Sequence, residues 1–302
     1  MRVGGTCAAH LALMGGAGAG ELFPATSHSH VVQTRPWGRL EQVADGVWAL
    51  ISTPLEDGTT LCNGGIVAGQ AGTAVIEAFA TPEGATWMAE RARALTGRWP
   101  DHVVVTHHHG DHTRGVEGYQ SDSAGPAIWV TDATRAATGE ALQVALAEAR
   151  ILPERPTTLD LGGRILRLVP RSGHTASDVV VALDDPSVVF CGDLVWNGMF
   201  PNYVDARPSA LSAAVAALER PGADTVYVPG HGVLADRDAL TRYRAVLDHV
   251  EAVAREAVAR GRSAAEAADG FALPPSLGEW YRFSASYPAR ALAAWMRELE
   301  GV

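Results

Sequence analysis

Lysine is absent from the sequence: all 24 basic residues are arginines, set against 34 acidic residues, which gives a formal charge of −10 at pH 7. Without lysine the chain has no phosphate-binding loop of the GxxxxGK[ST] type and no lysine that could form a Schiff base. An acidic chain without basic runs also lacks the positive surface that binds phosphate backbones. We therefore expect a small-molecule substrate and no nucleic acid among its partners.

Cysteine is also scarce, with Cys7, Cys62 and Cys191 as its three positions and no CxxC pair among them. This pattern argues against a disulfide framework and against a thiolate zinc site. The GxSxG motif is missing too, so no serine nucleophile of the α/β-hydrolase kind is indicated. Histidine and carboxylate groups are left as the candidates for chemistry.

Residues 1–35 are predicted to be a leader, either disordered or resembling a weak signal peptide. The first arginine is followed by no charge before Glu21, but glycines and His10 interrupt the apolar stretch. A cytoplasmic location is favoured over export, and the segment is too short and too rich in glycine to predict membrane insertion. Residues 36–240 are assigned to one domain and residues 241–302 to a helical extension packed on it. The oligomeric state is left open.

Short apolar runs that end in polar residues alternate with segments of helical pattern. The runs lie at 72–79, 102–112, 165–175, 187–194 and 224–232, and the helical patterns at 81–95, 139–150 and 209–220. Strands that alternate with helices predict an α/β fold with helices on both sides of the sheet structure. After residue 236, an amphipathic helix is predicted by the helical spacing of Leu240, Tyr243, Leu247, Val250 and Val253.

The stretch THHHGDHTRG, residues 106–115, concentrates histidine directly after an apolar run. If the chain is extended there, alternate side chains point the same way, so His107, His109 and Asp111 can converge while His108 points elsewhere. The spacing suits two metal ions, one held by His107 and His109 and the other by Asp111 and His112. Imidazole and carboxylate donors suit zinc, with iron and manganese as alternatives.

Further ligands must come from other segments, because two donors do not complete a metal site. Three candidates stand where an apolar run meets a glycine: His174 in SGHT, Asp193 in CGDL and His231 in PGHG. Open α/β sheets gather ligands at the carboxyl ends of their strands. We therefore expect these three side chains to join the histidine cluster.

The order HxHxDH, a lone histidine, GD and GH resembles the metallo-β-lactamase superfamily over about residues 40–235. The resemblance implies a four-layer αββα sandwich that binds two zinc ions per chain. It places His107, His109 and His174 on the first metal and Asp111, His112 and His231 on the second, and it makes Asp193 the bridging ligand. Asp111 would also have a catalytic role, because it could orient the attacking hydroxide.

The resemblance further implies a dinuclear zinc hydrolase that uses a metal-bound hydroxide on a small ester, lactone or thioester. Asp193 favours this range, because true β-lactamases of the superfamily generally carry cysteine or serine there. Hydrolysis of β-lactam amides and an iron-dependent oxidation like that of sulfur dioxygenases remain the alternatives. Glu77 stands where the family usually has aspartate. We expect its side chain to contact one of the metal ligands and not the metal itself. Asn202 and Tyr203 are the predicted substrate contacts.

Overall fold

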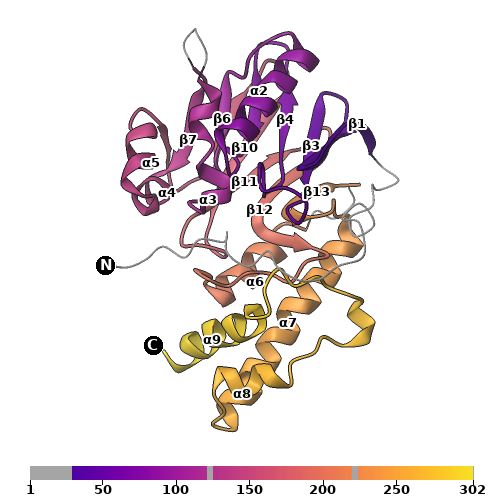
Figure 1. Cartoon of the computed structure of the whole chain (residues 1–302), viewed down its shortest axis with the longest axis vertical. Helices are drawn as coiled ribbons and strands as arrows, with labels where there is room; N and C mark the ends of the chain where they lie inside the picture. The colour runs from indigo at the N-terminus through magenta and orange to yellow at the C-terminus, as the bar shows by residue number, and fades with distance from the viewer. Residues whose placement is uncertain (1–28, 121–124, 220–223, 302) are drawn as a thin grey trace.

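Two β-sheets that pack face to face form the centre of the computed structural model, which describes residues 29–120, 125–219 and 224–301 (Figure 1). The first sheet has its strands in chain order, antiparallel from β1 to β5 and parallel from β5 to β8. They are β1 (His30–Arg35), β2 (Gly38–Ala44), β3 (Val47–Ser52), β4 (Gly64–Ala68), β5 (Thr73–Ile76), β6 (His102–Val104), β7 (Ala127–Thr131) and β8 (Arg150–Leu152).

The second sheet has the strand order β13-β12-β11-β10-β9. Only β12 and β13 run parallel in this sheet, and the other neighbours are antiparallel. Its strands are β9 (Thr157–Asp160), β10 (Ile165–Arg171), β11 (Asp178–Leu183), β12 (Val188–Asn197) and β13 (Val226–Gly232). The parallel pairing brings Trp196 of β12 opposite His231 of β13.

Helices such as α2 and α7 cover the outer faces of the two sheets. The helices of the described residues are α2 (Pro82–Thr96), α3 (Gly110–Thr113), η1 (Val116–Tyr119), α4 (Asp132–Ala137), α5 (Glu140–Ala145), α6 (Pro208–Ala216), α7 (Arg237–Ala259), α8 (Ala264–Asp269), η2 (Pro275–Leu277) and α9 (Tyr287–Glu300). Thr81 caps α2 by accepting a hydrogen bond from the Gly84 amide, and Gly97 ends it with φ at +79°. None of the described helices combines the length and the apolar character that a membrane crossing requires.

Apolar clusters among the described residues define the layers. One cluster fills the space between the sheets and includes Ile51, Leu168 and Phe190. Another joins the outer face of the first sheet to α2 through residues such as Met88, and a third joins the second sheet to the C-terminal helices. Strands such as β3 and β12 are buried along their whole length, because both of their faces are covered. The predicted four-layer αββα sandwich with a C-terminal helical extension is therefore confirmed.

Local predictions differ from the structure in three places. The helix predicted at 139–150 ends early, because Arg150–Leu152 pairs with β7 as a parallel strand instead. Strand β1 occupies positions 30–35 of the predicted leader, while residues 1–28 lie outside the described residues. Helix α7 runs without a break across the predicted boundary at residue 240. Strand pairing and helix packing, which act over long sequence distances, decide each of these positions.

Candidate metal centre

Side chains with metal-binding donor atoms meet in one place from four separate segments of the chain. His107 and His109 lie in the loop after β6, and Asp111 and His112 lie in α3. His174 lies between β10 and β11, Asp193 in β12 and His231 in β13. The structure thus brings together all seven residues that the sequence predicts as metal ligands.

The backbone stays extended only as far as His109, where φ is −62° and ψ is 148°. Gly110–Thr113 then forms the single helical turn α3, so the alternation of side chains stops before Asp111. As a result Asp111 lies with His112 and His231 and not with His107 and His109. The seven residues therefore form two groups.

The first group consists of His107, His109, His174 and one oxygen of Asp193. The Nδ1 atom of His109 lies 3.1 Å from Nε2 of His107 and 2.9 Å from Nε2 of His174. Oδ2 of Asp193 lies 3.2 Å from Nε2 of His174 and 3.8 Å from Nε2 of His107. Three imidazole nitrogens and a carboxylate oxygen thus face a common point.

The second group consists of Asp111, His112 and His231, and the other oxygen of Asp193 faces it. Oδ1 of Asp193 lies 3.1 Å from Nε2 of His112 and 3.4 Å from Nε2 of His231. Oδ2 of Asp111 lies 3.2 Å from the same nitrogen of His231. Asp193 therefore stands between the two groups and offers one oxygen to each.

Polar side chains lie beside the outer nitrogens of two histidines of the motif, His107 and His112. Thr106 Oγ1 lies 3.0 Å from Nδ1 of His107, and Glu77 Oε1 lies 3.0 Å from Nδ1 of His112. Glu77 is buried, and its backbone has φ at +81°, a region that non-glycine residues rarely adopt. This contact with His112 agrees with the expectation that Glu77 supports a metal ligand and does not bind the metal itself. Such outer partners fix the orientation of an imidazole and raise its basicity.

Asp205 is the partner that the sequence does not reveal. Its Oδ2 lies 2.8 Å from Nε2 of His109 and 3.5 Å from Nε2 of His108. The sequence gives no signal for this contact, because Asp205 follows β12 in an irregular segment far from the histidine motif. His108 also lies beside Asp205, and the donor atoms of His108, His109 and Asp205 form a further group that could hold a metal ion, so the exclusion of His108 from the ligand set stays a prediction.

Electrostatics differ between the two groups. Burial lowers the pKa of His107 well below its ordinary value and, although Asp193 opposes it, lowers the pKa of His174 to about 3. Burial also disfavours the charged form of His231, but the carboxylates of Asp193 and Asp111 raise its pKa to about 9. His107 and His174 thus present neutral imidazoles, whereas the surroundings of His231 favour its charged form.

The centre fits divalent cations, because several of its buried donor atoms have no hydrogen-bond partner among the described residues. These atoms are Nε2 of His112, Nε2 of His231 and Oδ1 of Asp193. A buried polar atom without a partner costs free energy, so native proteins rarely leave one unsatisfied. The two nitrogens lie within 3.4 Å of the carboxylate oxygen, and a cation at their centre would satisfy all three atoms.

The two predicted substrate contacts are buried. Tyr203 is 1% exposed inside the apolar cluster that the C-terminal helices share with the second sheet, and Asn202 accepts a hydrogen bond of 2.7 Å from Nη1 of Arg290. Their neighbours Val204 and Asp205 are exposed instead. The role of Asn202 and Tyr203 in substrate binding stays a prediction.

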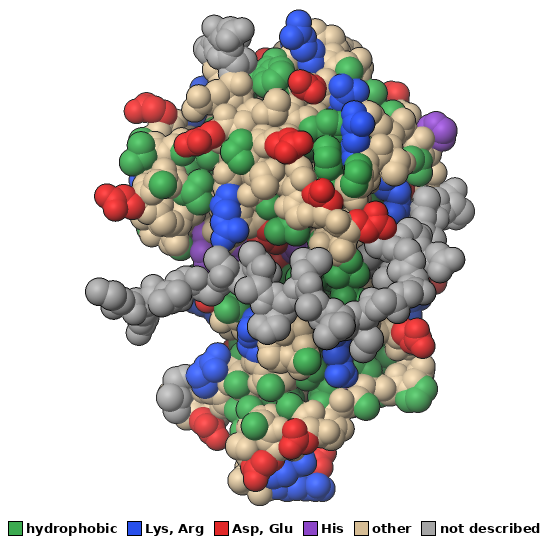
Figure 2. Space-filling view, in the orientation of Figure 1, with side chains coloured by type: hydrophobic (Ala, Val, Ile, Leu, Met, Phe, Trp, Pro, Cys, Tyr) green, Lys and Arg blue, Asp and Glu red, His purple; other side chains and the backbone are tan. Residues whose placement is uncertain are grey.

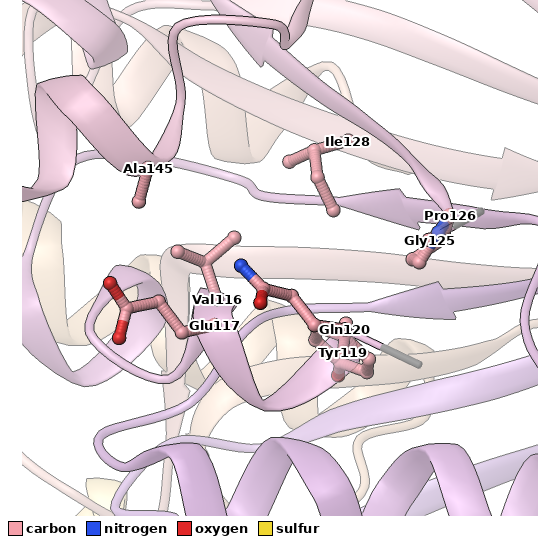
Figure 3. Close-up of a pocket in the computed structure, with 8 residues that line it drawn as sticks. All are labelled: Val116, Glu117, Tyr119, Gln120, Gly125, Pro126, Ile128 and Ala145. Atoms are coloured by element: carbon pink, nitrogen blue, oxygen red, sulfur yellow. The ribbon is translucent and has the colours of Figure 1, made fainter. Parts of the chain in front are cut away.

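The hollow above the C-terminal helices contains histidine and acidic side chains side by side (Figure 2). A separate pocket lies away from them, between η1, β7 and α5, and Figure 3 shows Val116, Tyr119, Ile128 and Ala145 around it. Its volume of about 80 Å³ is well below the roughly 300 Å³ at which ligand pockets begin. Tyr119 also donates a hydrogen bond of 2.8 Å to the carbonyl of Glu77, and none of the metal-binding side chains lines this pocket.

Comparison with known proteins places the chain in a family. The model of the metallo-beta-lactamase superfamily matches residues 57–231, which is more than half of the chain. The chain therefore belongs to the metallo-beta-lactamase superfamily, and the resemblance inferred from the sequence motifs is confirmed.

Curated relatives are hydroxyacylglutathione hydrolases. That of Acidiphilium cryptum is 30% identical over 154 residues, which cover 51% of this chain and 59% of the relative. That of Cereibacter sphaeroides strain ATCC 17025 is 27% identical over 150 residues, which cover 48% and 51% of the two chains. The chain spans about half the length of the curated relatives it matches.

Solved structures share the fold at low sequence identity. A metallo-beta-lactamase from Erythrobacter litoralis aligns with a TM-score of 0.55 and 22% identity, over 73% of this chain and 100% of its own. A stereoselective inverting sec-alkylsulfatase from a Pseudomonas species aligns with a TM-score of 0.64 and 17% identity, over 84% of this chain and 49% of its own. At these identities the likeness concerns the fold alone.

Replacement of Glu77 by Gln is expected to weaken zinc binding at the second group about 10- to 100-fold, because the neutral amide no longer fixes His112 and no longer raises its basicity. Competition with a chromophoric zinc chelator measures the change. Glu90→Gln, at an exposed position of α2, is the matched control and should bind zinc like the unaltered chain. Equal affinities in the two variants would show that the contact between Glu77 and His112 does not support a ligand.

Proposed function

We propose that this chain is a hydrolase with two zinc ions per chain that cleaves a small thioester, ester or lactone. The position of Asp193 carries the proposal, because its two oxygens face two separate groups of imidazole and carboxylate donors. One shared carboxylate supports a pair of cations better than a single one. The curated relatives are named hydroxyacylglutathione hydrolases, which favours a thioester within this range.

The donor set fits zinc, because imidazole nitrogens and carboxylate oxygens are its usual ligands in proteins. His107, His109 and His174 would hold one ion and Asp111, His112 and His231 the other, with Asp193 between them. When bound, two such ions lower the pKa of a shared water from about 16 towards about 7 and polarise a substrate carbonyl. No serine or cysteine nucleophile is then required.

Exposure of the side chains indicates where the substrate enters. The side chains of His109 and Asp111 are 17% and 15% exposed, whereas those of His107, His112 and His174 are at most 1% exposed. Solvent thus reaches the centre over His109 and Asp111. The exposed segment with Val204 and Asp205 borders this side, since Asp205 contacts His109.

Asp111 is the residue that we assign to proton handling. Its carboxylate is more exposed than that of Asp193, at 15% against 3%, so it can reach an attacking water. Nε2 of His231 lies 3.2 Å from its Oδ2 and keeps that oxygen turned towards the centre. Asp111 could therefore orient the water and hold its proton at the carboxylate oxygen that does not face His231, until the leaving group takes that proton.

The test is a metal analysis of protein purified without added metal, followed by a panel of thioester, lactone, β-lactam and phosphodiester substrates. We expect two zinc ions per chain and a kcat/KM for a thioester or lactone at least about tenfold above that for any β-lactam, a difference of about 1.4 kcal/mol in transition-state free energy. The variant His174→Gln, purified in parallel, controls for hydrolases from the expression host.

Two results would overturn the proposal. Efficient β-lactam turnover above that of every thioester and lactone would make the chain a β-lactamase. One iron per chain with oxygen uptake on a persulfide substrate would replace hydrolysis by sulfur oxidation.

A further inference from the structure

The imidazoles of the centre differ in how their outer nitrogens are held. His107, His109 and His112 each have an oxygen of Thr106, Asp205 or Glu77 at 2.8 to 3.0 Å from the nitrogen that faces away from the centre. The outer Nδ1 atoms of His112, His174 and His231 are all buried and make no hydrogen bond in the described ranges, although that of His112 lies 3.0 Å from a carboxylate oxygen of Glu77. A different contact must therefore set the planes of the His174 and His231 rings.

The indole of Trp196 provides such a contact to both rings. Its centroid lies 4.1 Å from that of His231, with an angle of 36° between the planes, and 6.5 Å from that of His174, with an angle of 41°. Trp196 is 4% exposed and lies in β12 three residues after Asp193. The ring of Tyr287 in α9 packs edge-on against the indole of Trp196, with the two centroids 6.1 Å apart.

Geometry explains why one side chain can serve two histidines from distant segments. The parallel pairing of β12 with β13 places the Cα atoms of Trp196 and His231 opposite each other. Strand β12 thus carries both Asp193 and the indole of Trp196, which packs against His174 and His231. A ring packed at a tilt against an imidazole restricts rotation about the last side-chain torsion of the histidine without any hydrogen bond.

We propose that Trp196 is a positioning residue, which aims Nε2 of His231, and to a smaller degree Nε2 of His174, at the metal ions by tilted ring-to-ring packing. The inference rests on the proposed zinc centre. Tyr287 of α9 contacts the same indole, so on this proposal the C-terminal helical extension also contributes to the geometry of the metal site.

Zinc affinity tests the proposal directly, by competition with a chelator on the full-length protein. Trp196→Leu keeps an apolar side chain but removes the ring, and we expect it to weaken the more weakly held zinc about 10- to 100-fold, as loss of an outer partner does. Trp196→Phe keeps a stacking ring and should restore the affinity to within about threefold of the unaltered chain. With cobalt in place of zinc, the Leu variant should also show a changed visible absorption spectrum, and the Phe variant should not.

Trp295→Leu is the matched control, because Trp295 is 2% exposed in the same apolar cluster and no ring contact joins it to the histidines among the described residues. It should lower the melting temperature but leave both zinc affinities unchanged. If Trp196→Leu does not fold, Trp196→Met takes its place with the same expected loss. Two zinc ions bound by the Leu or Met variant as tightly as by the Trp295 control would overturn the inference and leave the proposed function intact. An unaltered chain that binds no zinc would overturn both.

Discussion

Replacement of Asp193 by Ala is expected to lower kcat/KM for the thioester or lactone substrate on the order of 10³-fold, or about 4 kcal/mol in transition-state free energy. The side chain is 4% exposed, and four imidazole nitrogens lie between 3.1 and 3.8 Å from its two oxygens. Its loss would remove one donor from each group and the negative charge that balances two cations. Steady-state kinetics and zinc content of the same samples measure the effect.

Asp193→Asn separates charge from volume, because the amide has nearly the shape of the carboxylate. A similar loss is expected for it, since a neutral amide is a poor zinc ligand. Asp184→Asn is the control: this carboxylate pairs with Arg167 at 3.0 Å on the surface, and its replacement should leave kcat/KM unchanged. Full activity in a folded Asp193→Ala protein would rule out the bridging role.

Removal of zinc by dialysis against a chelator is expected to lower Tm on the order of 10 °C. Zinc at a thousand times its dissociation constant stabilises the native state by about 4 kcal/mol, and about 1 kcal/mol shifts Tm by about 2–4 °C in a chain of this size. The buried donor atoms of His112, His231 and Asp193 are without hydrogen-bond partners in the described structure when no cation joins them. Calorimetry before and after dialysis gives the shift.

Added zinc should restore the lost stability and magnesium should not, because magnesium prefers oxygen ligands over imidazole. His174→Gln serves as the control, since it lacks a donor of the first group and should respond less to the chelator. An identical Tm with and without chelator would contradict the assignment of these residues as ligands.

The ligand candidates could be predicted from the sequence because each stands in a short, ordered motif. HxHxDH, SGHT, CGDL and PGHG each follow or close an apolar run, and strand ends gather at one region of an α/β fold. The spacing suggests the two pairs His107 with His109 and Asp111 with His112, and the family resemblance assigns the remaining ligands to them. The local cause of the division into two groups, the helical turn at Gly110–Thr113, is not visible in the spacing, because the same letters also suit an extended chain.

Contacts between distant segments could not be predicted in the same way. Asp205 reaches His109 from an irregular segment, and Trp196 reaches His174 and His231 because β12 pairs with β13 in one particular register. Register and loop path depend on packing over the whole chain, which single-sequence patterns do not encode. The short extent of α5 has the same cause, since β8 forms by pairing with β7.

The sequence by itself determined the superfamily, the layered α/β architecture and the set of histidine and aspartate side chains, because these depend on motif order and on the period of apolar residues. Only the tertiary structure decided which oxygen of Asp193 faces which group, what holds each imidazole from behind, and that Asn202 and Tyr203 are buried while Val204 and Asp205 are exposed. The physical reason is that donor direction and burial are set by strand register and by helix packing, where residues far apart in the chain meet.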